Sequence, residues 1–147
     1  AEYERAIRYN RTFSTAILDI DGLAKINDQF GKEAGDTVLH EVAQCTYSNA
    51  RKTDSVGRIG DDEIAIIMPE TNLDNAVIIL DRLYAGITNL SLPNELTITI
   101  SCGTSQWAGE PDDTSEDIIN RSKLALDEAK HKGVNKIVAL QAFTSSR

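Results

Sequence analysis

Two groups of carboxylates, far apart in the sequence, each lie at the end of an apolar segment. Asp19 and Asp21 close the segment FSTAILDID, and Asp61, Asp62 and Glu63 form the polar centre of SVGRIGDDEIAIIMPE. Carboxylates this close together repel one another unless a cation lies among them, and Mg²⁺ is the usual cation when phosphates are also bound. If the two segments are neighbouring strands, the pattern suits metal-assisted nucleotidyl transfer. The alternative is that these are ordinary acidic surface turns.

The elements that must position these residues alternate between helical and strand periodicity. Gly31 closes a short helix, and Gly60 sets the turn of a hairpin. The expected elements are a strand at 13–21, the short helix at 22–31, a helix at 33–50, the hairpin at 55–70, a helix at 73–87, a half-buried strand at 96–103, a helix from Thr114 or Ser115 to Lys130, and a strand at 135–140. The order β-α-α-β-β-α-β-α-β predicts an α/β fold with a mixed central sheet covered by helices.

Composition restricts the class of protein. The chain has 147 residues, enough for one domain with a core, and a net charge of −8. An acidic balance argues against binding a nucleic acid polymer but permits a small phosphorylated ligand held by a few local cations. The two cysteines, Cys45 and Cys102, occupy apolar positions of periodic segments, so we expect two buried thiols.

The ends of the sequence suggest how the domain is delimited. We expect one domain over 1–143, a helical lead-in from a longer parent chain at 1–12, and a tail at 144–147. No apolar run approaches the roughly 20 residues of a membrane helix, and the first residues are charged, unlike a secretory signal. The expected location of the domain is therefore cytoplasmic, although the parent protein could be membrane-anchored.

Four stretches, in matching order and spacing, resemble the GGDEF domain of diguanylate cyclases, which join two GTP molecules into cyclic di-GMP. They are LDIDGLAKINDQFGKEAGD, RKTDSVGRIGDDEI, TISCG and AKHKGVN. The resemblance implies the GGDEF fold, related to nucleotidyl cyclases, with Mg²⁺ as cofactor and GTP as a possible ligand. It also implies a homodimer if the domain is an active cyclase, because each domain holds one GTP. The parent chain could carry sensor or phosphodiesterase domains.

The resemblance also assigns roles to residues. It implies metal binding by Asp19, the carbonyl of Ile20, and Asp62; catalysis by Asp62 and Glu63; guanine recognition by Asn27 and Asp36; and phosphate contact by Lys130. Asn and Asp together complement the polar edge of guanine, although Asp36 could instead cap a helix. Whether Glu63 takes part in the chemistry or holds the hairpin stays open.

Departures from the family pattern gather where the triphosphate should lie. Asp61 replaces a glycine, Ala24 a lysine and Val134 an arginine, so two cations are lost and a carboxylate is gained. Ile64 replaces a phenylalanine of the same motif as Asp61, and milder changes are Leu23 for Phe and Lys32 for His. Each lost charge-assisted contact costs about 1.5–3 kcal/mol, and Asp61 would strain the tip if its φ had to be positive. We therefore expect weak or lost cyclase activity.

A second motif is better preserved. Arg51 and Asp54 have the R-x-x-D spacing of the family's inhibitory site for cyclic di-GMP, and Arg82 occupies the position of a further arginine of that site. Arg can offer a bidentate fork to guanine or phosphate, while Asp accepts from the guanine amine edge. The alternative is a solvated Arg–Asp pair worth under about 1 kcal/mol.

Three functional hypotheses follow. The first is a degenerate GGDEF domain in bacterial cyclic di-GMP signalling that binds the dinucleotide at the R-x-x-D site. The second is an active diguanylate cyclase with product inhibition, and the third is an interaction or scaffold domain in which neither site works. His40, His131 and Trp107 are interpreted as structural or surface residues.

Overall fold

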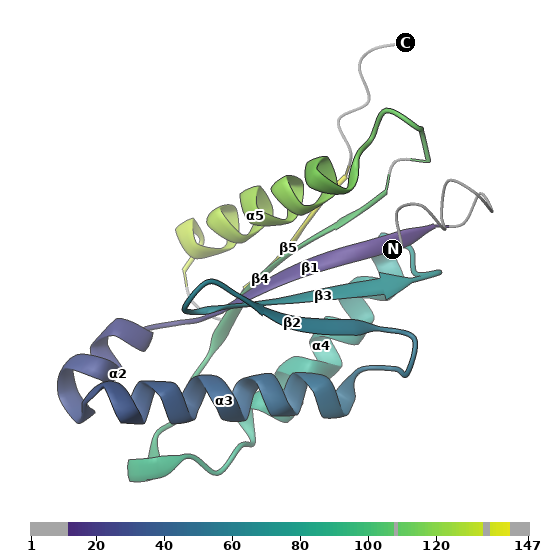
Figure 1. Ribbon diagram of the computed structural model, residues 1–147. Helices are drawn as coiled ribbons and strands as arrows, with labels where there is room; N and C mark the ends of the chain where they lie inside the picture. The colour runs from purple at the N-terminus through teal and green to yellow at the C-terminus, as the bar shows by residue number, and fades with distance from the viewer. Residues whose placement is uncertain (1–11, 108, 134–135, 142–147) are drawn as a thin grey trace.

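A five-stranded sheet forms the centre of the computed structural model, which describes residues 12–107, 109–133 and 136–141 (Figure 1). The strands are β1 (Phe13–Ile20), β2 (Ser55–Ile59), β3 (Glu63–Pro69), β4 (Ile100–Gln106) and β5 (Ile137–Leu140). Their order across the sheet is β2-β3-β1-β4-β5. Only the pairing of β4 with β5 is parallel, so the predicted mixed sheet is confirmed.

Helices cover both faces of the sheet, in the predicted order. They are α2 (Leu23–Phe30), α3 (Lys32–Asn49), α4 (Leu73–Thr88) and α5 (Ser115–His131), with a short 3₁₀ turn η1 (Pro93–Glu95). Helix α5 packs on β1, β4 and β5, whereas α3 and α4 pack together on the opposite side, as Figure 1 shows. None of the helices in the described ranges is long and apolar enough to cross a bilayer.

Local sequence signals explain where two of the helices begin. Gly31 separates α2 from α3 with φ 93°, a backbone conformation that favours glycine. At the start of α5, the Thr114 hydroxyl accepts from the Asp117 N–H, and the Asp117 carboxylate accepts from the Thr114 N–H. This reciprocal capping box satisfies two donors that the first turn of a helix leaves without partners, which confirms the predicted start of α5.

The largest cluster of buried apolar side chains lies where α3 and α4 cover the sheet, smaller clusters lie around Trp107 and between α5 and β5, and β1 is buried along its whole length. Strand β4 differs from the prediction, because it begins at Ile100 and is buried on both faces rather than half-buried. It lies between β1 and β5, with α5 on one face and α4 on the other. Its buried hydroxyls find partners inside the protein: Thr104 Oγ1 donates to the Thr15 carbonyl at 2.7 Å, and Ser101 Oγ donates to the Asp21 carboxylate at 2.6 Å.

The cysteine prediction is correct for one residue only. Cys102 is fully buried, and burial raises the pKa of its thiol. Cys45 is partly exposed at the contact between α3 and α4. The predicted lead-in helix (apart from residue 12), the tail and Val134 lie outside the described residues.

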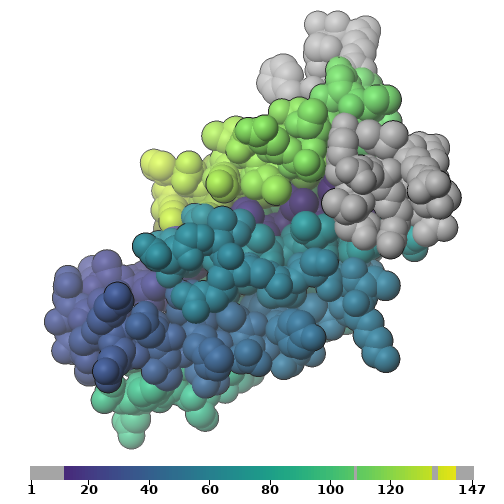
Figure 2. Space-filling view, in the orientation of Figure 1, coloured from purple at the N-terminus to yellow at the C-terminus, as the bar shows by residue number. Residues whose placement is uncertain are grey.

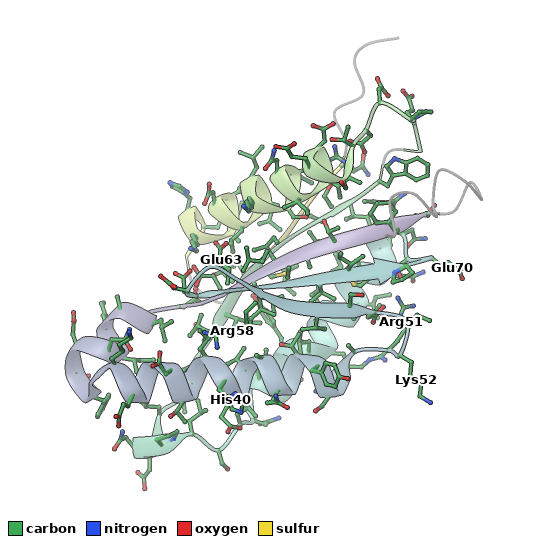
Figure 3. All side chains as sticks on the ribbon, viewed as in Figure 1. His40, Arg51, Lys52, Arg58, Glu63 and Glu70 are labelled. Carbon is green, nitrogen blue, oxygen red and sulfur yellow. The ribbon has the colours of Figure 1, made fainter. Side chains whose placement is uncertain are left out.

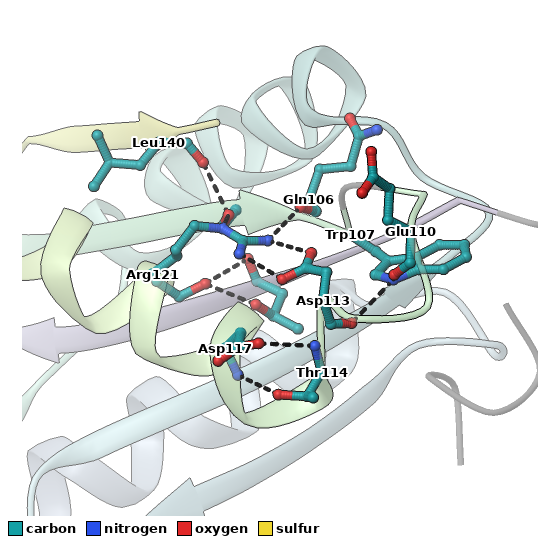
Figure 4. A network of polar contacts seen from close by, with 11 residues as sticks. Gln106, Trp107, Glu110, Asp113, Thr114, Asp117, Arg121 and Leu140 are labelled. Carbon is teal, nitrogen blue, oxygen red and sulfur yellow. Dashed lines mark hydrogen bonds and ion pairs between the residues drawn. The ribbon is translucent and has the colours of Figure 1, made fainter. Parts of the chain in front are cut away.

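An ion pair between Arg121 and Asp113 holds α5 against the end of β4 at Gln106 (Figure 4). The Arg121 guanidinium donates to both carboxylate oxygens of Asp113, at 2.7 and 2.8 Å, and to the carbonyl of Gln106 at 2.9 Å. Nearby, the Trp107 indole N–H lies 3.1 Å from the Asp113 carbonyl, and its ring stacks on Phe13 at 6.1 Å between centroids. Trp107 is therefore structural, as expected.

Candidate functional site

The hairpin brings the two carboxylate groups together. Strand β1 pairs with β3 so that Asp19 lies directly across from Glu63, and Asp62 is the last residue of the turn before β3. The turn residue with positive φ is Gly60, at 61°. Asp61 does not adopt a left-handed conformation, so the strain predicted for this position is absent.

A hollow of about 460 Å³, which we call the strand-end hollow, opens beside these carboxylates. It is lined by Asp19, Ile20, Asp21, Gly22, Leu23, Ala24, Asp62, Lys130 and Gly133. All four residues predicted to bind metal or phosphate, Asp19, Ile20, Asp62 and Lys130, therefore meet in one place. Glu63 is not part of the lining.

Charge is partly balanced inside the strand-end hollow. The Lys130 ammonium forms an ion pair with the Asp19 carboxylate, whose residue is only 7% exposed. Burial raises the pKa of Asp19, and Lys130 opposes that rise. Burial, together with Asp19 and Asp62, raises the pKa of Glu63. For Lys130, burial lowers the pKa but the Asp19 carboxylate outweighs it, and the net shift is upward.

Asp21 is held in place by two hydroxyl groups. Thr99 Oγ1 and Ser101 Oγ donate to its two carboxylate oxygens at 2.7 and 2.6 Å. These bonds fix the segment that leaves β1 against the start of β4, so Asp21 has a structural role at the rim of the hollow.

A second hollow of about 550 Å³, the helix-side hollow, adjoins the first and shares Leu23, Ala24 and Asp62 with it. Its remaining lining residues are Asn27, Lys32, Gly35, Asp36, Leu39, Arg58 and Asp61. In the space-filling view of Figure 2, the teal hairpin lies between the blue α2–α3 pair and the green α5. The two hollows flank the tip of this hairpin.

Two polar side chains predicted to read guanine line the helix-side hollow. Asp36 lies inside α3, five residues after Gly31, so it does not cap the helix. The Asn27 amide oxygen is buried and has no hydrogen-bond partner within the described part of the chain. A buried acceptor without a partner is costly, which makes Asn27 a candidate for ligand contact.

Two cations of this hollow, Lys32 and Arg58, were not predicted as site residues. Arg58 comes from β2, and Lys32 begins α3. In the sequence, Lys32 stands out only as a departure from the family pattern. Arg58 is part of the stretch RKTDSVGRIGDDEI, which resembles the family, but the resemblance assigns it no role. Neither carried a signal of its own that would have placed it beside Asn27.

Arg51 and Asp54 lie at the opposite end of the hairpin from the tip; Figure 3 shows Arg51 and Glu63 far apart along it. Arg51 Nη2 lies 2.7 Å from Asp54 Oδ1, and its Nε donates to the same carboxylate at 3.1 Å. Nη2 also donates to Thr71 Oγ1 at 2.6 Å and to the Pro69 carbonyl at 3.2 Å. The hydrogen bond that the guanidinium donates to the Asp54 carboxylate raises the pKa of Arg51.

The two partners differ in their access to solvent. The Arg51 side chain is 44% exposed, whereas that of Asp54 is 1% exposed. Arg51 Nη1 makes no hydrogen bond to the residues that the structure describes. Asp54 therefore orients Arg51 in this conformation, and its carboxylate does not face solvent as a guanine acceptor would.

Arg82 is exposed on α4. Gly86, one helical turn later, packs near Cys45 and Asn49 in the last turns of α3. Residues four apart share a helix face, so Arg82 lies on the side of α4 that meets the end of α3, where Arg51 follows. No direct contact joins Arg82 to Arg51 among the described residues.

Comparison with known proteins agrees with this geometry. Residues 1–136 match the family described as "Diguanylate cyclase, GGDEF domain". The chain belongs to the GGDEF domain family. Among curated relatives, it is 37% identical to response regulator PleD of Caulobacter vibrioides over 134 residues, and 32% identical to the probable diguanylate cyclase DgcC of Escherichia coli over 137 residues. These alignments cover 88% and 92% of this chain but only 29% and 37% of the relatives, so the chain spans about a third of their length.

Solved GGDEF domains have the same fold. The active GGEEF domain of a diguanylate cyclase from Vibrio cholerae superposes with a TM-score of 0.89 at 28% identity, covering 97% of this chain and 91% of that one. The GGDEF domain of DgcB from Caulobacter crescentus, solved in complex with c-di-GMP, gives 0.86 at 25% identity, with 92% and 82% covered. The predicted fold class and family are therefore confirmed.

Proposed function

We propose that this GGDEF domain is a receptor module for cyclic di-GMP with weak or lost cyclase activity. The observation that carries the proposal is the preformed Arg51 site. Asp54, Thr71 and the Pro69 carbonyl hold the guanidinium in one orientation, and Nη1, which bonds to none of the described residues, is the nitrogen we assign to the ligand. A fixed donor loses less conformational freedom on binding than a flexible side chain does.

The ligand assignment rests on charge and on relatives. Arg51 and Arg82 supply two cations, which suits a dinucleotide with two phosphates and two guanine bases. A family neighbour, the GGDEF domain of DgcB, was solved with c-di-GMP. Asp54 contributes by aligning Arg51 rather than by contacting the base.

The two hollows beside the hairpin tip, where the resemblance places GTP, carry more negative than positive charge, which disfavours a polyphosphate. Five carboxylates line the two hollows, Asp19, Asp21, Asp36, Asp61 and Asp62, against three cations, Lys32, Arg58 and Lys130. Ala24, where the family pattern has a lysine, lies in the wall that both hollows share. Phosphoryl transfer depends on positioning and charge stabilisation, so this balance supports slow or absent turnover.

The residues present do fit Mg²⁺. Asp19 and Asp62 offer carboxylate oxygens in one hollow, and Ile20, the last residue of β1, lines the same hollow. No group of three or more His, Cys, Asp or Glu side chains in the described ranges is arranged as a metal site, so nucleotide phosphates and water would complete the coordination. A bound Mg²⁺ would neutralise phosphate charge; Lys130 would hold phosphate oxygens, and Glu63 would hold the hairpin beside Asp19.

A second candidate function is an active diguanylate cyclase with product inhibition. The backbone of the hairpin tip favours this function, because Asp61 does not have a positive φ and Asp62 lines the strand-end hollow. In that case a homodimer would be required, with one GTP in each domain. Either function would place the domain in the cytoplasm, within a parent protein that also carries other domains.

The experiment is isothermal titration of the chain with cyclic di-GMP, repeated on Arg51→Ala and on Lys52→Ala. Lys52 is the matched control, because it is the adjacent exposed cation and makes no hydrogen bond or ion pair among those of the described residues. We expect binding that Arg51→Ala weakens at least tenfold and Lys52→Ala leaves within about twofold, since a charge-assisted contact is worth about 1.5–3 kcal/mol.

A parallel incubation with GTP and Mg²⁺, followed by chromatography for cyclic di-GMP, separates the candidates. Product formation at a rate typical of cyclases would replace the receptor proposal with the cyclase. Binding of neither nucleotide would leave a scaffold domain. Equal loss in the Arg51 and Lys52 variants would show that the ligand is held by general charge and not by the R-x-x-D site.

A further inference from the structure

Gly35 lies where any other residue would collide with Asn27. A Cβ built on Gly35 would stand 1.6 Å from Asn27 Oδ1, 2.7 Å from its Cγ and 3.2 Å from its Nδ2. The three nearest atoms therefore all belong to the side-chain amide of one residue. The amide of Asn27 occupies the space that a side chain at position 35 would fill.

The backbone of Gly35 gives no reason for a glycine. The residue lies within α3 and does not have a positive φ. Glycine is the poorest helix former apart from proline, so its presence in the first turns of α3 weakens the helix. The reason for glycine must come from its missing side chain.

A second observation concerns what Asn27 does in that space. Its amide oxygen is buried and has no hydrogen-bond partner in the described part of the chain, and the residue itself lines the helix-side hollow together with Asp36. Without the vacant space above Gly35, the Asn27 side chain would have to rotate into another rotamer. The amide would then lose its present position in the hollow.

We propose that Gly35 is a positioning residue for base recognition: by lacking a side chain, it holds the Asn27 amide in the orientation that reads the edge of a guanine base. In this proposal Gly35 acts through Asn27 and makes no contact of its own with the base. The inference rests on the prediction, implied by the family resemblance, that Asn27 and Asp36 recognise the guanine base of a bound GTP.

The test is a cycle of three variants, Gly35→Ala, Asn27→Ala and the double substitution. GTP and ATP, each with Mg²⁺, are titrated into each protein. We expect Gly35→Ala to lower GTP affinity about as much as Asn27→Ala, by roughly tenfold, as a lost hydrogen bond to a buried group does. The double variant should bind no more weakly than Asn27→Ala alone, and affinity for ATP should change little throughout.

Melting temperatures of the same proteins give a readout that needs no ligand. In the Asn27→Ala background, Gly35→Ala should raise the Tm by about 2–4 °C, because alanine favours the helix and the collision is gone. In the presence of Asn27 that gain should be missing.

Three results would overturn the proposal. Additive losses of GTP affinity would mean that Gly35 acts independently of Asn27. A lower Tm after Gly35→Ala in both backgrounds would mean that Gly35 serves the close packing of α2 on α3. Failure of the unaltered chain to bind GTP would remove the guanine assignment, while the Tm cycle would still report whether the two residues are coupled.

Discussion

Asp19 is a buried carboxylate whose charged form burial disfavours. Its carboxylate is buried beside Asp62 and Glu63, and Lys130 is its ion-pair partner. Because burial raises its pKa despite Lys130, the folded state binds this proton more tightly than the unfolded state does. Its contribution to stability is thus present below the unfolded pKa of 3.8 and is lost as pH rises through the raised folded value.

We therefore expect Asp19→Asn to be more stable than the unaltered chain at about pH 7, by roughly 2–4 °C in Tm, the shift that about 1 kcal/mol produces in a domain of this size. The difference should shrink towards about pH 4. Thermal melts with a chelator and without nucleotide would measure it. Asp28→Asn, an exposed carboxylate on α2, is the control and should change little. A lower Tm for Asp19→Asn at neutral pH would show that the Lys130 pair outweighs burial.

At the scale of elements, α5 approaches β4 so closely at Gly103 that the backbone of the helix leaves no room for a side chain there. A Cβ on Gly103 would stand 2.1 Å from both the Leu126 nitrogen and the Ser122 carbonyl oxygen. Neither backbone group can rotate away, so α5 itself would have to shift. We expect Gly103→Ala to lower the free energy of unfolding by at least about 3 kcal/mol, the upper range for overpacking.

Gly57 on β2 provides the matched control. It is also a strand glycine, but a Cβ there would meet no atom within 4 Å. Gly57→Ala should leave stability unchanged or raise it by up to about 1 kcal/mol. Urea unfolding followed by circular dichroism measures both variants. Similar losses for the two would argue that strand glycines matter here through flexibility and not through helix approach.

Element types and order could be predicted from the sequence, but burial on the two faces could not. Periodicity located α3, α4 and α5 to within a residue or two, because amphipathic stripes and the Thr114 cap are local signals. The alternation of Leu96 to Cys102 suggested a half-buried strand. It misled because Ser101 and Thr104 are buried with partners on β1 and its following segment, and only the strand order brings those partners near.

The candidate site was predictable to a similar extent. Family motifs identified candidate residues, and the fold brings these residues together in the two hollows. They did not indicate that Asp54 is buried under Arg51 or that Thr71 joins the pair, since Thr71 belongs to a turn with no motif of its own. They also gave no hint that the Asn27 amide lies over Gly35, which depends on how α2 packs on α3.

At the scale of the whole molecule, the single tryptophan reports on unfolding from one end of the sheet. Trp107 is 4% exposed and stacks on Phe13 at the start of β1, whereas Asp19 and the hairpin tip lie at the other end of that strand. Because β1 joins these two ends and pairs with β3 and β4 along its length, we expect cooperative unfolding. Urea curves from tryptophan fluorescence and from far-ultraviolet circular dichroism should coincide.

Saturating cyclic di-GMP offers a sharper form of the same measurement. A ligand at 100 times its Kd adds about 2.7 kcal/mol, and although the Arg51 site lies at the Trp107 end of the sheet, where Pro69 pairs with Phe13, the ligand should shift both curves by equal amounts. A fluorescence transition that precedes the circular dichroism transition, or a ligand shift confined to the fluorescence curve, would show that the two ends of the sheet unfold separately.

The position of β1 has a consequence for how the protein is made. This strand is synthesised before every other strand of the sheet, yet it lies at the centre, with β3 on one side and β4 on the other. Its pairing of Ser14 with Gln106 spans 106 − 14 = 92 residues. At about 5–20 residues per second, the ribosome needs roughly 5–20 seconds to deliver that partner. Strand β3 can pair with one edge of β1 earlier, but the edge that faces β4 stays unpaired for the whole interval. The nascent chain is therefore most exposed to aggregation before β4 emerges, and folding must be largely post-translational for the C-terminal half of the sheet.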